Sequence, residues 1–176
     1  KYLTGGKLKQ AIRHFIIEKS REVFEQKGYT NTTIEDIARA SDISKPTVYN
    51  YFSGKDAIFR SVVELANSEM DELITPIISG AELFTEKLEK LTYEYLSHVN
   101  KNRGILKIAF HESHMFIEAI DNNSFGGMER LLEATERRVN TIKAFFKEGK
   151  HQGFIIEDVP VDLIAVFYMG VLGEFS

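Results

Sequence analysis

The chain of 176 residues contains no cysteine and no tryptophan, and only three prolines. Without cysteine there are no disulfide bridges and no thiolate metal sites, which fits a reducing cytoplasm. No apolar run approaches the ~20 residues that span a bilayer, and the first ten residues lack the hydrophobic stretch of a signal peptide. We therefore expect a cytoplasmic protein with no membrane segment. Because residue 1 is lysine and not methionine, we also expect a short piece of chain upstream.

The sequence also lacks the patterns of common enzyme classes. It has no Gly-rich phosphate loop and no nucleophile–base motif, and its five histidines are scattered. His111 and His114 are three residues apart, whereas the two histidines of the zinc-protease motif are four apart, and Glu112 would point elsewhere on a helix. We therefore expect no enzyme, no metal site and no cofactor.

Negative charge is scarce only in the first third of the chain. Residues 1–60 hold 11 Lys and Arg against 7 Asp and Glu, whereas residues 61–176 hold 11 against 19. The net charges are +4 and −8, within a total of −4. Chance alone produces such splits. Together with a nucleic-acid-binding motif, however, this asymmetry would turn the basic end of the molecule toward phosphate.

Helical periodicity dominates the whole chain, and no alternating strand pattern or internal repeat is found. The pattern predicts an all-α fold of about eight helices. We expect two domains, residues 1–55 and residues 56–176. We also expect the apolar segment 104–117 to run through the middle of the second domain. The first helix should close at Lys27, with Gly28 as its C-terminal cap.

Residues 32–59 carry the most informative pattern, two short helices joined by a tight turn. Thr33 is a good N-cap, and its spacing to Asp36 fits a capping box. Asp42 tolerates the left-handed backbone that such a turn often needs. Ser44 caps the second helix, and Pro46 sits in its first turn, where a missing N–H is harmless. This arrangement predicts a helix-turn-helix.

The second of these helices carries its polar side chains on one face. Val48 and Phe52 are four residues apart and should point inward. Five polar or aromatic residues remain outside or at the edge: Lys45, Thr47, Tyr49, Asn50 and Tyr51. A polar, aromatic-rich face of this kind is typical of a recognition helix that enters a DNA groove.

The amino-acid sequence of this region resembles that of the tetracycline-repressor (TetR) family of bacterial transcription regulators. The resemblance spans roughly the first third of the chain without a gap. Its residues are Phe24, Gly28, Tyr29, Thr32-Thr33-Ile34, Ile37-Ala38, Ile43-Ser44, Thr47-Val48-Tyr49, Tyr51-Phe52 and Lys55. Asp42 stands where the family usually has Gly, and Pro46 where Gly or Ala is commoner. Both suit the local geometry, and they could change which bases are read.

The expected DNA contacts divide into two kinds. Phosphates should be bound by the backbone N–H groups and hydroxyl of Thr33, the hydroxyls of Tyr49 and Tyr51, and the ammonium of Lys55. Base edges should be read from the helix that Ser44 caps, by Lys45, Pro46, Thr47 and Asn50. The resemblance implies the same positions, with Tyr49 and Lys55 as typical backbone contacts. The alternatives are that the tyrosines pack, that Lys55 is solvated and that Thr33 is only a cap.

The second domain resembles the family's ligand-binding half in layout, which implies an all-helical effector-binding and dimerisation domain. An apolar pocket between its helices would suit a largely apolar small molecule. The residues expected to line it are Phe84, Leu88, Tyr95, Phe110, His111, His114, Met115, Phe116, Phe145 and Phe146. The same stripe also fits a plain helical core.

The chain stops in the apolar segment 161–175. Members of the family usually continue into one more helix, and the last two helices of each subunit form a four-helix bundle. We therefore expect the C-terminus to be incomplete, with this segment at a homodimer interface. The alternative is that the segment is buried in its own subunit.

The resemblance implies a sequence-specific DNA-binding transcription regulator. We expect a repressor that a small-molecule effector releases from a palindromic operator in double-stranded DNA. The alternative is a ligand-independent DNA-binding factor on the same scaffold that acts through protein partners. Repression and activation would need the same DNA contacts.

Overall fold

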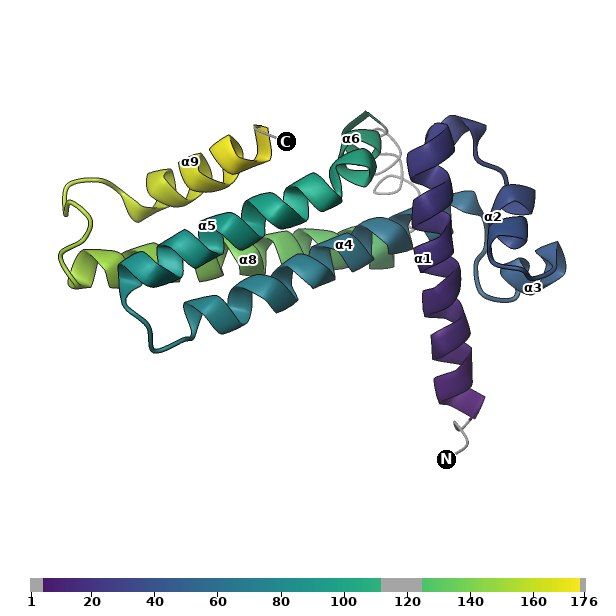
Figure 1. Cartoon of the computed structure of the whole chain (residues 1–176), viewed down its shortest axis with the longest axis horizontal. Helices are drawn as coiled ribbons and strands as arrows, with labels where there is room; N and C mark the ends of the chain where they lie inside the picture. The colour runs from purple at the N-terminus through teal and green to yellow at the C-terminus, as the bar shows by residue number, and fades with distance from the viewer. Residues whose placement is uncertain (1–4, 112–124, 175–176) are drawn as a thin grey trace. The chain divides into compact units, whose positions relative to one another are not determined.

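The computed structural model describes residues 5–111 and 125–174 (Figure 1). Within these ranges the chain forms eight α-helices and no β-strand, which confirms the predicted all-α fold. The helices are α1 (Gly5–Asn31), α2 (Ile34–Ala40), α3 (Lys45–Tyr49), α4 (Lys55–Ile78), α5 (Phe84–Lys101), α6 (Arg103–His111), α8 (Phe125–His151) and α9 (Val161–Glu174). None of the helices in the described ranges is long and apolar enough to cross a membrane.

The chain forms two compact units, and the division between them falls inside α4. Of the described residues, unit 1 comprises 5–65 and 104–111, and unit 2 comprises 66–103 and 125–174. Helix α6, which is the described part of segment 104–117, therefore belongs with unit 1. The expectation that this segment runs through the second domain was wrong for residues 104–111, and its remaining residues lie outside the described ranges. Gly104, near the start of α6, approaches Glu25 of α1 so closely that an added Cβ would lie 3.1 Å from Glu25 Cγ.

Unit 1 is built on an aromatic and aliphatic core between α1, α2, α3 and the first half of α4. Phe24 and Phe59 are fully buried, and their rings meet edge to face with centroids 5.1 Å apart. Helix α1 kinks at Gly28, whose φ of +74° lies in the region that favours glycine. The helix was expected to close at Lys27. It instead resumes after the kink and ends at Asn31.

Unit 2 packs α9 against α8 and α5, and side chains from α5 and α8 reach the second half of α4. The ring of Phe84 stacks with those of Phe145 and Phe154, with centroid separations of 4.7 and 5.6 Å. Gly149 lies inside α8, where an added Cβ would be 2.5 Å from the Phe84 ring. The glycine therefore allows α5 and α8 to approach closely.

Among the described residues of unit 2, four polar side chains are buried, namely Lys87, His98, Asn102 and Arg138. All but Asn102 contact a distant part of the sequence. Lys87 donates to the Glu148 carboxylate at 2.9 Å. His98 contacts the carbonyl oxygen of Ala66 through Nε2 at 2.9 Å. Arg138 donates to Asp71 Oδ1 at 2.7 Å, and to the side-chain oxygen and carbonyl oxygen of Asn67 at 3.0 and 2.9 Å. These contacts hold α4, α5 and α8 together.

Candidate DNA-binding surface and effector cavity

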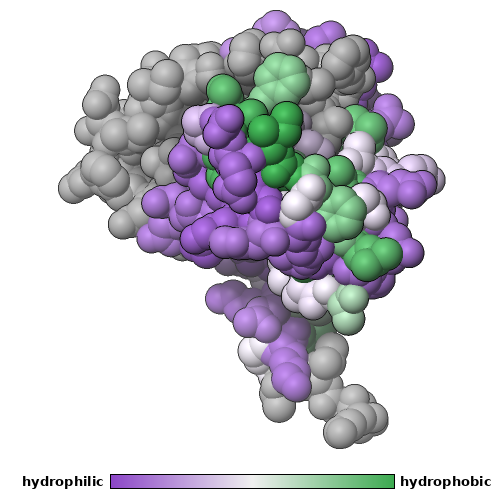
Figure 2. All heavy atoms as spheres, turned by 90° about the vertical axis from the view of Figure 1, so that its left-hand side faces the viewer, coloured by the Kyte–Doolittle hydropathy of each residue, from purple (hydrophilic) through white to green (hydrophobic). Residues whose placement is uncertain are grey.

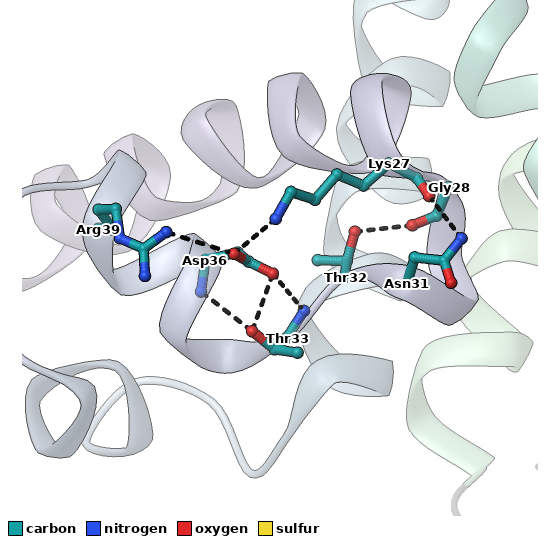
Figure 3. A network of polar contacts seen from close by, with 7 residues as sticks. All are labelled: Lys27, Gly28, Asn31, Thr32, Thr33, Asp36 and Arg39. Carbon is teal, nitrogen blue, oxygen red and sulfur yellow. Dashed lines mark hydrogen bonds and ion pairs between the residues drawn. The ribbon is translucent and has the colours of Figure 1, made fainter.

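The first helix of the candidate DNA-binding motif begins with the predicted capping box (Figure 3). Thr33 Oγ1 accepts a hydrogen bond from the backbone N–H of Asp36 at 3.2 Å, and the N–H of Thr33 donates to Asp36 Oδ2 at 3.1 Å. The capping box therefore supplies hydrogen-bond partners for backbone N–H groups at the N-terminal end of α2. The hydroxyl and N–H of Thr33, expected to bind phosphate, are both engaged with Asp36 in this structure.

Asp36 is the centre of the network drawn in Figure 3. Its Oδ1 lies 2.6 Å from Lys27 Nζ and 3.7 Å from Arg39 NH1. Hydrogen bonds from Lys27 and from Thr33 lower the pKa of Asp36 to about 2, because each stabilises the ionised carboxylate. The network joins the end of α1 to the start of α2.

The turn between α2 and α3 has the geometry that its sequence predicts. Asp42 has a φ of 53°, the left-handed conformation that Asp tolerates. Ser44 is the N-cap of α3, and its Oγ accepts from the backbone N–H of Thr47 at 3.3 Å. Pro46 lies in the first turn. The turn and the start of α3 are therefore fixed by residues that lie within a few positions of one another in the sequence.

The second helix of the motif buries one face and exposes the other. Val48 and Phe52 are buried, with 0% and 4% of their surface exposed. The predicted base-reading and phosphate-binding side chains lie on the outer side or at the edge. Ser44, Lys45, Pro46, Tyr49 and Asn50 are exposed, and Thr47, Tyr51 and Lys55 are partly exposed. The helix itself ends at Tyr49, and Asn50 is its C-cap.

Both lysines of the predicted DNA contact set have partners within unit 1. Lys45 forms an ion pair with Glu35 of α2, and this hydrogen bond lowers the pKa of Glu35 and raises that of Lys45. Lys55 Nζ donates to the carbonyl oxygens of Tyr29 and Thr30 at 2.8 and 3.3 Å, at the end of α1. Neither pairing was predicted, because the partners lie 10 to 26 residues apart in the sequence.

Unit 2 contains an apolar cavity of about 500 Å³ between α5, α8 and α9. Its size lies within the range of small-molecule sites. The lining residues are Leu88, Thr92, Phe146, Val159, Leu163, Ile164, Phe167 and Tyr168. None of these lining residues carries a formal charge at neutral pH, so the cavity suits an uncharged group.

The two hydroxyl groups in the lining are bonded to each other. Thr92 Oγ1 donates its single proton to the carbonyl oxygen of Leu88 at 2.7 Å, because a carbonyl oxygen cannot donate. The contact of 3.0 Å between Thr92 and Tyr168 therefore uses the Tyr168 proton. Burial raises the pKa of the Tyr168 hydroxyl, which keeps that proton in place. The cavity consequently offers no free hydroxyl proton to an incoming carboxylate.

Two of the residues predicted to line a pocket, Leu88 and Phe146, do line this cavity. Phe84, Tyr95 and Phe145 are instead buried in the core of unit 2. His111 is exposed at the end of α6 in unit 1 and does not line the cavity. The remaining predictions lie outside the described side chains, namely Phe110, His114, Met115 and Phe116.

Thr92, Val159 and the α9 residues of the lining were missed. The apolar residues of α9 were noticed in the sequence, but they were expected at a dimer interface or, alternatively, in the core of their own subunit, and not in the lining of a cavity. Leu163, Val166 and Phe167 are 60–69% exposed, and Val166 does not line the cavity. Figure 2, which faces the left-hand side of Figure 1, shows apolar surface among hydrophilic residues. Leu163, Val166 and Phe167 are three and four residues apart, so they share one exposed face of α9 and are not scattered single apolar residues.

The motif matches a known family. Residues 16–62 match the family model described as "Bacterial regulatory proteins, tetR family". The chain is also similar to the HTH-type transcriptional repressor DhaR of Mycobacterium sp. (strain GP1). The two sequences are 23% identical over 158 residues, which cover 89% of this chain and 76% of that protein.

Two solved structures share the fold over most of the chain. The fatty acid degradation regulator FadR from Bacillus halodurans has a TM-score of 0.73 at 18% identity, covering 99% of this chain and 83% of that chain. FadR from Bacillus subtilis in complex with stearoyl-CoA has a TM-score of 0.67 at 22% identity, covering 92% and 83%. At these identities the likeness establishes the fold and not the ligand.

Proposed function

Because this chain belongs to the TetR family of DNA-binding transcription regulators, we propose that it is a cytoplasmic repressor that a largely apolar small molecule releases from a palindromic operator. The observation that carries this proposal is the outer face of α3. It presents polar side chains outward from a capped helix whose inner face is buried. A short helix of this kind fits the major groove, where base edges carry a distinct pattern of donors and acceptors.

The proposed contacts follow from the chemistry of the exposed groups. Asn50 suits the paired donor and acceptor of adenine, Lys45 suits guanine, and the methyl group of Thr47 and the ring of Pro46 suit thymine. Tyr49, Tyr51 and Lys55 would bind phosphates and hold α3 in register. These donors contribute affinity but carry no direct sequence information.

One helix-turn-helix covers half of an operator, so the proposal includes a homodimer. The exposed α9 face supports a dimer, because Leu163, Val166 and Phe167 present apolar surface to solvent in a single chain. A two-fold dimer places two copies of α3 on half-sites about one helical turn, or a multiple of it, apart.

The cavity in unit 2 is the proposed effector site. Its apolar lining and paired hydroxyls favour a neutral molecule over a carboxylate. By linkage, an effector that binds the DNA-free conformation more tightly must lower DNA affinity by the same factor. A ligand that binds both conformations equally would change nothing.

The test uses an operator selected from random DNA and a series of neutral and carboxylate compounds of equal chain length. We expect neutral compounds to lower operator affinity, and we expect Leu88→Trp to abolish that response by filling the cavity. Tyr93→Trp is the matched control, since Tyr93 lies on the same helix and is 70% exposed. If compounds bind in the cavity but never alter operator affinity, the ligand-independent alternative holds and the effector proposal fails.

A further inference from the structure

The ion pair between Glu35 and Lys45 joins the two helices of the DNA-binding motif. Glu35 lies in the first turn of α2, and Lys45 is the first residue of α3. The Lys45 ammonium donates to a Glu35 carboxylate oxygen. Their side chains are 45% (Lys45) and 54% (Glu35) exposed, so DNA can reach both. An exposed ion pair contributes little to folding, which leaves its effect on DNA binding as the property of interest.

We propose that Glu35 is an internal competitor of DNA for the Lys45 ammonium, and that it thereby limits the affinity of the recognition helix. The inference rests on the proposed function, in which Lys45 binds DNA. In the free protein the ammonium already has an anionic partner. The ammonium has three donors, so a phosphate or guanine either displaces Glu35 or shares the ammonium with it. In both cases DNA binds a cation whose charge Glu35 already partly neutralises.

Glu35 also changes the electrostatics of the interface. Where it is displaced, its carboxylate is left without its cation beside the phosphate backbone. The pair as a whole brings no net charge to the DNA, whereas Lys45 alone would bring one positive charge. Since the salt dependence of binding follows the phosphate charge that a protein neutralises, Glu35 should lower that dependence by about one charge.

The decisive variant is Glu35→Gln, which removes the negative charge and keeps the size of the side chain. Asp42→Asn is the matched control. It removes the same charge from the turn between α2 and α3, and Asn also tolerates the left-handed backbone at this position. Among the residues that the structure describes, Asp42 forms no ion pair. The comparison therefore separates release of Lys45 from a general loss of negative charge.

We expect Glu35→Gln to bind operator DNA about two- to fivefold more tightly than Asp42→Asn, the range that an exposed ion pair allows. The logarithmic salt slope of Glu35→Gln should be steeper by up to about one. In a Lys45→Met background the two variants should bind equally, because no ammonium remains to be released. Fluorescence anisotropy with labelled operator measures all of these quantities, and circular dichroism verifies that the variants are folded.

Two results would overturn the inference while leaving the proposed function intact. One is equal affinity of Glu35→Gln and Asp42→Asn; the other is an advantage of Glu35→Gln that persists without Lys45. Should Glu35→Gln prove unfolded, Glu35→Ala replaces it with the same expected outcomes. A chain that binds no DNA in any form would refute the proposed function, and this inference with it.

Discussion

The DNA-binding motif in unit 1 and the helical bundle of unit 2 are held together by contacts of different range. In the motif, the capping box joins Thr33 to Asp36, and the second cap joins Ser44 to Thr47, each three residues apart. In unit 2, Lys87 and Glu148 lie 61 residues apart, and Thr92 and Tyr168 lie 76 apart. Contacts of the first kind can be predicted from the local sequence. Contacts of the second kind form only when distant segments come together in the folded chain.

This difference assigns different tasks to the polar groups of the two regions. In the motif they lie at the surface and fix the backbone of two short helices, which leaves the outer face of α3 open to a partner. In unit 2, Lys87 and Arg138 are buried and link separate helices. A buried cation that loses its partner is costly, whereas a surface pair contributes little. The two regions should therefore respond differently to substitution.

The largest expected effect is on unit 2. Arg138→Met removes three hydrogen bonds and leaves acceptors on Asp71 and Asn67 without their donor. We expect a loss of about 2–4 kcal/mol in the free energy of unfolding, below the upper range for buried pairs because Asp71 is partly exposed to water. Urea denaturation measures it. Lys27→Met, which removes a surface partner of Asp36, is the control and should lose less than about 1 kcal/mol. Equal losses would show that the buried contacts of Arg138 and the surface contact of Lys27 contribute alike to stability.

On the outer face of α3 a substitution should change recognition and not stability. Asn50→Ala removes the group proposed to pair with adenine. We expect the preference of the protein for one base, at one position of the operator, to weaken by ~1–3 kcal/mol. Binding-site selection from random DNA measures this preference. If wild type and variant select the same sequence, Asn50 does not read a base.

A smaller effect is expected at Lys55, which caps the end of α1 and is proposed to contact phosphate with its remaining donor. Lys55→Ala should weaken binding to all sequences alike and lower the logarithmic salt slope by about one. Anisotropy titrations at several salt concentrations measure the slope. An unchanged slope would assign Lys55 to the structure of unit 1 alone.

The smallest effect concerns pH and the network of Figure 3. The folded-state pKa of Asp36 is about 2, below its ordinary value of 3.8. The stability that ionised Asp36 contributes is therefore fully present above about pH 4 and is lost as the pH falls toward 2. The urea midpoint of the wild type should fall more steeply over this window than that of Asp36→Asn. Parallel curves would show that Asp36 adds nothing to the folded state.

The sequence separation between contacting residues also explains which features could be predicted from the sequence. Both caps, the left-handed Asp42 and the buried Val48 were predicted, because each depends on neighbours a few residues away. The placement of α6 with unit 1 was not predicted, because an apolar helix can pack in the core of either unit. The lysine pairings were missed because no local pattern brings residues 10 to 26 positions apart into contact.

The lining of the cavity could be predicted from the sequence only in part, for the same reason. Leu88 was predicted from the apolar stripe of α5, but Phe84 and Tyr95 on that stripe are buried core. Which side of α5 faces a cavity depends on where α9 packs, and the stripe itself does not contain that information. The apolar side chains of α9 predicted an exposed surface correctly, yet Leu163 and Phe167 also line the cavity.

In the proposed function, exposed side chains on and next to α3 read base edges in a DNA groove. The most direct measurement is selection of bound sequences from random duplex DNA by the purified chain, followed by affinity measurements at fixed salt concentration. We predict enrichment of a two-fold symmetric site that binds at least about a thousandfold more tightly than random DNA. Failure to enrich any sequence, with no affinity difference between selected and random duplexes, would contradict the claim.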